Sequence, residues 1–256
     1  MKTALITGAS SGIGKELALV FAEKKYRPVL VARRESKLIY LAEDIKREFF
    51  IDAIVISLDL SKPDSAEQLM DIIRKKNLYI DVLVNNAGFG DFGDFHKEDI
   101  NRLESMMHLN MLTLTKLCRL IAPHMVENNF GHILNIASTA AFQPLPNFAV
   151  YAATKAYVLN FSEALAYELK PLGVHVTTVC PGATLSEFQE KAKMNNSDKI
   201  FKGAPLSFVV AEFAFEAMMK RKTLAIYGSN NRFLTFMLRF SPRKLAIKVA
   251  AKMMKD

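Results

Sequence analysis

The stretch Thr7-Gly8-Ala9-Ser10-Ser11-Gly12-Ile13-Gly14 joins an apolar, β-branched run, Thr3–Thr7, to a helical pattern over Ile13–Lys24. Small residues at such a turn let backbone N–H groups approach a pyrophosphate at the helix N-terminus, where the helix dipole favours negative charge. Glycines alone are a weak indication, because any tight turn uses them. Here they follow a strand of buried type and open a helix, and this context predicts a pyrophosphate site.

The first two thirds of the chain repeat this strand-then-helix order. Apolar runs such as Val29–Val31 and Val82–Val84 lack a polar face, which is typical of strands buried on both sides of a parallel sheet. Repeated β-then-α order requires crossover connections. We therefore expect an α/β fold: a single-domain, Rossmann-type doubly wound parallel sheet with a C-terminal helical extension. The predicted strands are Thr3–Thr7, Pro28–Ala32, Ala53–Leu58, Asp81–Asn85, Gly131–Ala137, Val174–Cys180 and Leu224–Tyr227, and the predicted helices are Ile13–Lys24, Glu35–Phe49, Pro63–Lys76, Lys97–Asn128 and Tyr151–Leu169.

The length of 256 residues suits one α/β domain of several layers. We assign residues 1–230 to the catalytic domain and residues 231–256 to a basic, amphipathic helical extension of the same domain. Residues 184–205, with Asn195-Asn196-Ser197 and Gly203, form the least regular stretch. A loop of this length in a compact domain is usually functional, and often a lid.

Cysteine usage and hydropathy indicate a cytoplasmic protein. Cys118 and Cys180 follow no metal or redox spacing, which favours two buried free thiols in a reducing compartment. The apolar run Ala4–Ile6 is too short for a secretory signal, and the longest uncharged stretch, Ile133–Thr154, contains too many polar residues and prolines to span a membrane. No metal site is predicted.

The net charge of +8 is concentrated at the C-terminal end. Ten Lys or Arg residues and one acid lie between Lys220 and Asp256, so the first 219 residues are close to neutral. This distribution argues against a nucleic-acid-binding core and indicates a locally basic C-terminal element.

The end of the second strand, Val31-Ala32-Arg33-Arg34, bears on which dinucleotide the site takes. A carboxylate at Ala32 would accept hydrogen bonds from an adenosine ribose and repel a phosphate, whereas the guanidinium groups of Arg33 and Arg34 suit a 2′-phosphate. The alternative is a solvated, basic helix N-terminus, although cations are disfavoured at a helix start. The pattern favours NADP(H) over NAD(H).

Over about residues 1 to 190 the sequence resembles the typical-length branch of the short-chain dehydrogenase/reductase family. The glycine spacing Gly8-x3-Gly12-x-Gly14, the acid Asp59 and the segments Asn85-Asn86-Ala87-Gly88 and Pro181-Gly182 carry the resemblance. Asn110, Ser138, Tyr151 and Lys155 fall where the family places its catalytic tetrad. The cofactor-binding residues that we predict are Gly8, Ser10, Ser11, Gly12, Ile13, Gly14, Arg33, Arg34, Asp59, Leu60, Asn86, Ala87, Gly88, Tyr151, Lys155, Pro181, Gly182 and Thr184.

Tyr151 and Lys155 are four residues apart on a predicted helix and so share one face. A neighbouring ammonium favours the phenolate, so we expect Lys155 to lower the pKa of Tyr151 towards the working pH. Tyr151 would donate a proton to a carbonyl oxygen as hydride arrives, and Ser138 would hydrogen-bond the same oxygen. The resemblance implies that Lys155 also holds the nicotinamide ribose and that Asn110 holds a relay water.

Two positions depart from the family pattern. Many NADP-preferring relatives carry a basic residue just before the second motif glycine, where this sequence has Ser11. The NADP(H) prediction therefore depends on Arg33 and Arg34. After Pro181-Gly182 the family often has a threonine that contacts the nicotinamide, and both Thr184 and Ser186 are candidates here.

Apolar side chains cluster in sequence around the expected substrate entry, which favours a lipophilic carbonyl or alcohol substrate. They could equally fill the core or a subunit contact. These residues are Phe89, Phe92, Phe95, Phe142, Leu145, Phe148 and Phe188.

The stretch Asn231–Lys255 reads as two short helices broken near Pro242, with basic and apolar residues interleaved. It could cover the pocket, pack against another subunit or lie on an anionic membrane surface. The resemblance also implies a homodimer or homotetramer. Besides an oxidoreductase, the sequence leaves open a non-catalytic NADP(H)-binding regulator and a membrane-surface scaffold.

Overall fold

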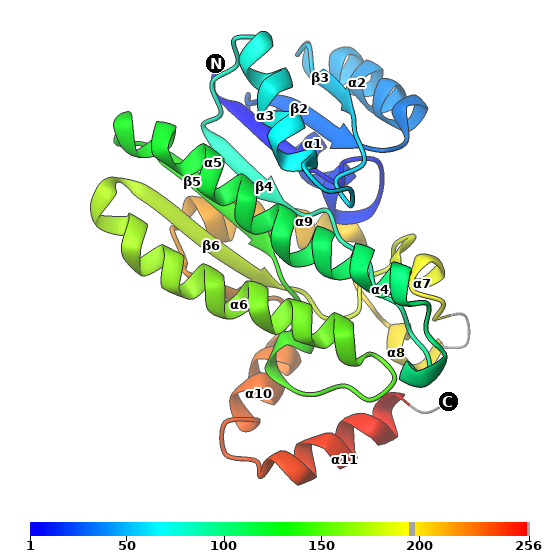
Figure 1. The fold of residues 1–256 in the computed structure, drawn as a ribbon. Helices are drawn as coiled ribbons and strands as arrows, with labels where there is room; N and C mark the ends of the chain where they lie inside the picture. Colours follow the sequence, from blue (N-terminus) through cyan, green and yellow to red (C-terminus); the bar gives the residue numbers. More distant parts are fainter. Residues whose placement is uncertain (195–197, 255–256) are drawn as a thin grey trace.

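A computed structural model describes residues 1–194 and 198–254, so the predicted loop residues Asn195-Asn196-Ser197 lie outside the described residues. In the described part, one parallel sheet has the strand order β3-β2-β1-β4-β5-β6-β7 (Figure 1). The order reverses between β1 and β4, and ligands of such sheets bind at this switch point. The doubly wound sheet is confirmed. Its strands are β1 Thr3–Thr7, β2 Arg27–Ala32, β3 Ile54–Ser57, β4 Val82–Asn85, β5 Gly131–Ile136, β6 Val174–Cys180 and β7 Leu224–Ile226.

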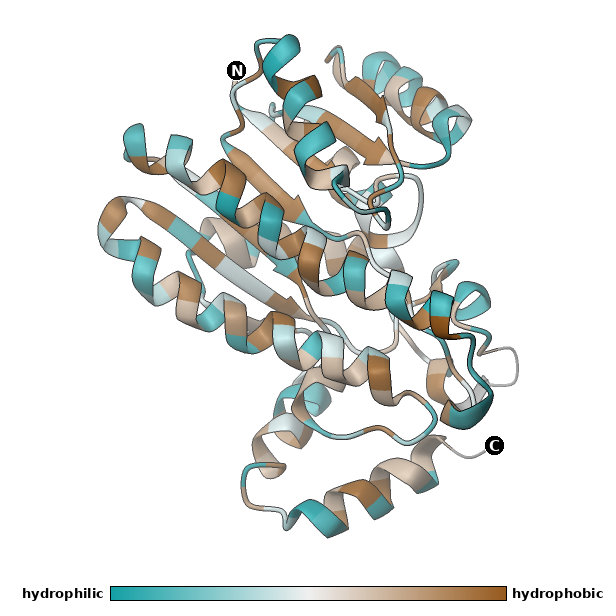
Figure 2. Ribbon diagram, viewed as in Figure 1, coloured by the Kyte–Doolittle hydropathy of each residue, from teal (hydrophilic) through white to brown (hydrophobic). Residues whose placement is uncertain are grey.

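Helices cover both faces of the sheet because successive strand residues point to opposite sides. Ala4 and Ile6 of β1 pack on the side that carries α1, α2 and α9. Leu5 packs on the opposite side, with α3, α5 and α6. Figure 2 shows apolar central strands and helices that alternate between apolar and polar bands. The helices are α1 Gly12–Glu23, α2 Glu35–Phe49, α3 Ser65–Lys75, α4 Ile100–Met107, α5 Leu114–Glu127, α6 Ala149–Leu169, α7 Phe188–Lys191, α8 Asp198–Phe201, α9 Ser207–Met219, α10 Ser229–Met237 and α11 Arg243–Met254.

The long helix predicted over Lys97–Asn128 is not one regular helix. A short 3₁₀ helix at Phe95–Lys97 precedes α4, and a π-helical segment, His108–Thr113, separates α4 from α5. A single π turn occupies only one turn of a longer helical region, so the sequence pattern indicates helix on both sides and does not mark the π turn itself. Asn110 lies within this segment, and π turns are frequent at functional sites.

The irregular stretch 184–205 contains the short helices α7 and α8. The two predicted tail helices are confirmed as α10 and α11, with the break at Pro242 between them. They form a separate pair beside the end of α6, drawn in orange and red in Figure 1. Within residues 1–194 and 198–254, no helix combines the length and apolar composition needed to cross a bilayer.

Candidate active site

A cavity of about 910 Å³ opens at the carboxyl ends of the strands. Its lining comes from the glycine turn, the loop after β6 and the tail helices. All of the predicted site residues except Gly14 and Asn110 line this cavity. The topology therefore brings together residues as far apart in the sequence as Gly8 and Thr184.

The glycine turn lies against the segment that follows β4. Gly8 and Gly12 adopt φ of +69° and +56°, a region that favours glycine. A Cβ on Gly8 would lie 2.9 Å from Ala87 Cα. Asn86 Nδ2 donates to Thr7 O at 3.0 Å, and the backbone N–H groups of Asn86 and Ala87 donate to Thr7 Oγ1, each at 3.0 Å. The resulting cradle has the small residues and exposed backbone that a dinucleotide pyrophosphate requires.

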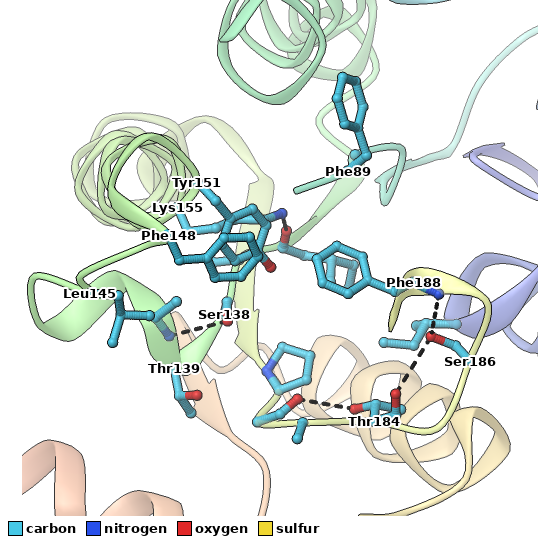
Figure 3. Close-up of a pocket in the computed structure, with 18 of the residues that line it drawn as sticks. Phe89, Ser138, Thr139, Leu145, Phe148, Tyr151, Lys155, Thr184, Ser186 and Phe188 are labelled. Atoms are coloured by element: carbon cyan, nitrogen blue, oxygen red, sulfur yellow. Dashed lines mark hydrogen bonds between the residues drawn. The ribbon is translucent and has the colours of Figure 1, made fainter. Parts of the chain in front are cut away.

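Ser138, Tyr151 and Lys155 converge in the middle of the cavity (Figure 3). Ser138 follows β5, and its Oγ accepts a hydrogen bond from the N–H of Ala140 at 3.1 Å. Tyr151 lies in the first turn of α6 and Lys155 one turn later; both are buried. The Lys155 amine donates to the carbonyl oxygen of Ile136 at 2.8 Å. A strand end and a helix start thus hold a hydroxyl, a phenol and an amine beside the cofactor cradle.

Burial controls the ionisation of this group. It raises the pKa of Tyr151 to about 12, against the effect of a hydrogen bond with Ser138, and lowers the pKa of Lys155 to about 8. The expected downward shift of Tyr151 is therefore wrong for this structure. The physical reason is that Lys155 Nζ lies 5.8 Å from the Tyr151 ring centroid and bonds to a backbone carbonyl, so desolvation of the phenol prevails.

Asn110 lies behind the cavity wall and joins two of its parts. Its Nδ2 donates to Phe89 O and to Thr154 Oγ1, each at 3.0 Å, and its Oδ1 accepts from the N–H of Phe89 at 3.2 Å. A Cβ on Gly88 would lie 2.9 Å from Asn110 Oδ1. The π-helical segment thus places an amide that positions both the segment after β4 and the helix that carries Tyr151.

At the other side of the glycine turn, Arg34 is held more firmly than Arg33. Arg34 Nη2 donates to Ser10 Oγ at 3.0 Å and to Ser11 Oγ at 2.8 Å. The Arg33 side chain is 64% exposed, and its nearest carboxylate oxygen, on Asp59, is 3.9 Å away. Arg34 thus holds its guanidinium against the turn.

Sequence reasoning missed Glu187, Lys191 and Lys37, which lie beside Arg34. Glu187 Oε2 lies 2.7 Å from Arg34 Nη1 and 3.0 Å from Lys191 Nζ, and its Oε1 lies 2.6 Å from Lys37 Nζ. The i, i+4 spacing of Glu187 and Lys191 was the one visible signal, and it is common on helix surfaces.

The substrate side of the cavity is largely aromatic. Phe148 stacks on Tyr151 with ring centroids 4.3 Å apart, and Phe188 faces Tyr151 at 5.4 Å (Figure 3). Of the predicted apolar cluster, Phe89, Leu145, Phe148 and Phe188 line the cavity. Phe95 is instead exposed, and Phe92 packs against Phe148. Phe142 packs against the apolar core on the side of the sheet that carries α3, α5 and α6.

Thr184 and Ser186, the two candidates that the sequence left open, both line the cavity. Thr184 Oγ1 donates to Gly182 O at 3.1 Å, and Ser186 Oγ accepts from the N–H of Phe188 at 3.2 Å. Ser186 also lies close to the turn, because a Cβ on Gly12 would be 3.2 Å from Ser186 Cβ. Ser186 therefore links the loop after β6 to the glycine turn.

That loop, which we call the lid (residues 184–194), is tied to the segment after β4. The buried Asp91 pairs with Arg102 at 2.9 Å and with Lys193 at 3.0 Å. The N–H of Phe92 donates to Ala192 O at 2.9 Å. On the opposite side, one face of α10 closes the cavity through Leu234 and neighbouring apolar residues.

Comparisons with known proteins agree with this geometry. A profile of the short chain dehydrogenase family matches residues 2–197. A very-long-chain 3-oxoacyl-CoA reductase of Rattus norvegicus is 36% identical over 182 residues, covering 70% of this chain and 58% of the relative. The chain thus spans less than two thirds of the length of that relative.

Solved structures match almost the whole chain. A short-chain dehydrogenase from Sphingobium yanoikuyae in complex with NADPH is 31% identical, with a TM-score of 0.84 over 93% of this chain and 92% of that one. One from Burkholderia phymatum in complex with NAD is 24% identical, with a TM-score of 0.82 over 92% of each chain. The matched profile, the relatives and the sheet together show that the chain belongs to the short-chain dehydrogenase/reductase family of oxidoreductases.

Proposed function

We propose that the protein is an NADP(H)-dependent oxidoreductase that reduces a carbonyl group on a lipophilic small molecule or oxidises the matching secondary alcohol. One observation carries the proposal: Ser138 and Tyr151 lie in one cavity between a dinucleotide cradle with two arginines and an aromatic, apolar end. Residues 1–230 would supply the catalytic domain, and residues 231–256 its extension.

The buried phenol suits proton donation. Bound NADPH supplies the hydride that reaches the carbonyl carbon. With its pKa raised to about 12, Tyr151 keeps its proton at neutral pH and can give it to an alkoxide as that charge develops. Ser138 would donate a hydrogen bond to the same oxygen, and Lys155 would hold the cofactor ribose beside it.

The 2′-phosphate preference rests on Arg33 and Arg34, with Asp59 and Leu60 lining the adenosine end. Guanidinium groups bind phosphate in a fork that an ammonium does not match. The NADPH complex of the Sphingobium yanoikuyae relative supports the same choice. The remaining candidates, Ser10, Ser11, Ile13, Pro181, Gly182 and Thr184, would contact the rest of the dinucleotide.

The substrate would extend from Tyr151 towards the tail helices. Leu234 and Met237 of α10, Leu238 directly after it, and Leu245 and Val249 of α11 line this part of the cavity. An apolar channel of this kind suits a carbonyl compound with a long hydrocarbon part. The name of the Rattus norvegicus relative points to such a substrate class.

The outer face of the tail supports a peripheral membrane contact for a cytoplasmic protein. Phe233, Phe236 and Phe240 are exposed, and Arg239 and Arg243 lie close to them in sequence. Aromatic and basic side chains on one amphipathic element bind the headgroup region of anionic bilayers. The inner face would then receive a lipophilic substrate close to the membrane.

We propose that the protein forms a homodimer or homotetramer whose subunits contact one another through the helix that carries Tyr151. Tyr157 and Tyr167 of α6 are exposed, and so is Leu112 in the π-helical segment before α5. Sedimentation of the purified protein would give the oligomeric state.

The decisive experiment is a turnover screen with NADPH and NADH against short and long-chain ketones and aldehydes. We expect oxidation of NADPH, faster with long-chain ketones. The alternative, a non-catalytic NADP(H)-binding regulator, predicts binding with no turnover across the whole panel.

A further inference from the structure

A lid carboxylate occupies the centre of a cationic cluster at the adenosine end of the cavity. Glu187 contacts Arg34, Lys37 and Lys191, at 2.7, 2.6 and 3.0 Å. Arg34 and Lys37 follow β2, whereas Glu187 and Lys191 lie about 150 residues later in the lid. Lys191 also donates to Ser11 Oγ at 3.4 Å, so the lid reaches the glycine turn itself.

The cluster has more positive charge than its carboxylate neutralises. Three cations surround Glu187, and their side chains are between 34% and 47% exposed. Partial burial opposes ionisation of Glu187, but hydrogen bonds from Lys37, Lys191 and Arg34 hold its pKa well below the usual range. The carboxylate is therefore charged at neutral pH, and a more highly charged anion would find the same donors within reach of solvent.

A cofactor 2′-phosphate has the chemistry to replace it. Such a monoester carries a charge of about −1.5 to −2 at neutral pH and offers three acceptor oxygens, against one charge and two oxygens for a carboxylate. The Arg34 guanidinium that Glu187 contacts is the group already assigned to that phosphate. Both anions cannot occupy the same donors without strong repulsion.

We propose that Glu187 is an internal counter-ion that the 2′-phosphate of NADP(H) displaces, and that Lys37 and Lys191 join Arg34 as ligands of that phosphate. The inference rests on the proposed NADP(H) preference and extends it to the lid. Phe188, the next residue, lies 5.4 Å from Tyr151 between ring centroids.

The test compares two probes that differ only in this phosphate, adenosine 2′,5′-bisphosphate and adenosine 5′-monophosphate, by calorimetric titration. In Glu187→Gln, we expect the bisphosphate to bind about fivefold more tightly, because one competing charge is gone. The affinity for the monophosphate should change by less than about twofold. Lys37→Ala and Lys191→Ala should weaken bisphosphate binding about three- to tenfold and leave monophosphate binding unaltered.

Glu190→Gln provides the matched control, since Glu190 is an exposed acid on α7, the short helix that begins directly after Glu187. It should leave both affinities as in the wild type, and thermal unfolding would verify that every variant folds. Unchanged or weaker bisphosphate binding in Glu187→Gln would overturn the counter-ion role while the NADP(H) preference of the wild type stands. Equal binding of both probes by the wild type would instead overturn that preference and this inference with it.

Discussion

The amine of Lys155 donates a hydrogen bond to the carbonyl oxygen of Ile136, with 2.8 Å between the two atoms. This bond anchors the lysine to the end of β5, one helical turn from Tyr151. It leaves the amine with two further protons to donate into the cavity. The lysine is thus positioned by the sheet and the tyrosine by the helix, and both must keep their places for the chemistry proposed here.

Replacement of the proton donor should abolish turnover and spare binding. In Tyr151→Phe we expect kcat to fall by about 10²- to 10⁴-fold, the usual contribution of a positioned general acid. NADPH binding, followed by its fluorescence, should remain within about threefold of the wild type. Tyr167→Phe on the same helix is the control, because Tyr167 is 85% exposed and does not line the cavity. Full activity in Tyr151→Phe would disprove the assigned mechanism.

The reduction rate should depend on the charge of Lys155. Burial lowers the pKa of its amine to about 8, so the charged form is lost as the pH rises through that value. We expect kcat/KM for ketone reduction to fall above about pH 8. In Lys155→Arg the residual activity should lack this fall, since a guanidinium stays charged. A wild-type rate that stays flat to pH 10 would contradict the role of the ammonium.

Most of the fold could be predicted from the sequence because it depends on local patterns. Apolar strands and the glycine turn fix the sheet and its cradle, whereas Ser138, Tyr151 and Lys155 are predicted from the resemblance to the family. The π-helical segment around Asn110 could not be predicted, because the sequence pattern indicates helix on both sides of it and does not mark the π turn itself. The contact of Glu187 with Arg34 depends on tertiary folding alone, which brings the lid to the second strand.

The two arginines should contribute unequally to cofactor choice. Arg34 bonds to both serines of the turn, whereas the Arg33 side chain is mostly exposed. We expect Arg34→Ala to weaken NADPH binding by about 10- to 100-fold, as for the loss of a charge-assisted contact, and Arg33→Ala to weaken it less than about fivefold. NADH binding by both variants should match the wild type. Titrations with both cofactors check this, and a larger effect at Arg33 would reverse the assignment.

A buried histidine beside a second, partly exposed one should make stability fall in mild acid. His132 on β5 lies opposite His175 on β6, and burial lowers the pKa of His132 to about 4. The unfolded chain therefore binds a proton between about pH 6.5 and 4 that the folded chain does not, so acid favours unfolding across that window.

Urea unfolding of wild type and His132→Leu at pH 7 and pH 5 measures the effect. From pH 7 to 5 the wild type should lose about 1–2 kcal/mol more than the variant, which has no imidazole to protonate at this position. Equal losses in the two proteins would show that His132 does not carry the acid sensitivity.

The two faces of α10 should separate membrane binding from catalysis. Leu234, Met237 and Leu238 line the cavity, with Leu234 and Met237 also partly exposed, whereas Phe233, Phe236 and Phe240 are exposed and do not line it. A variant with Ser at the three phenylalanines should lose flotation with vesicles that contain phosphatidylserine, because each buried aromatic ring contributes about 1.5–3 kcal/mol to partitioning. Its kcat with a soluble short-chain ketone should stay within about twofold of the wild type, since the cavity wall is intact.

Leu234→Ser should do the reverse: it should keep flotation but raise the KM for long-chain ketones. If the triple variant floats as well as the wild type, the three phenylalanines do not hold the protein on the bilayer, and the outer face of the tail serves another contact.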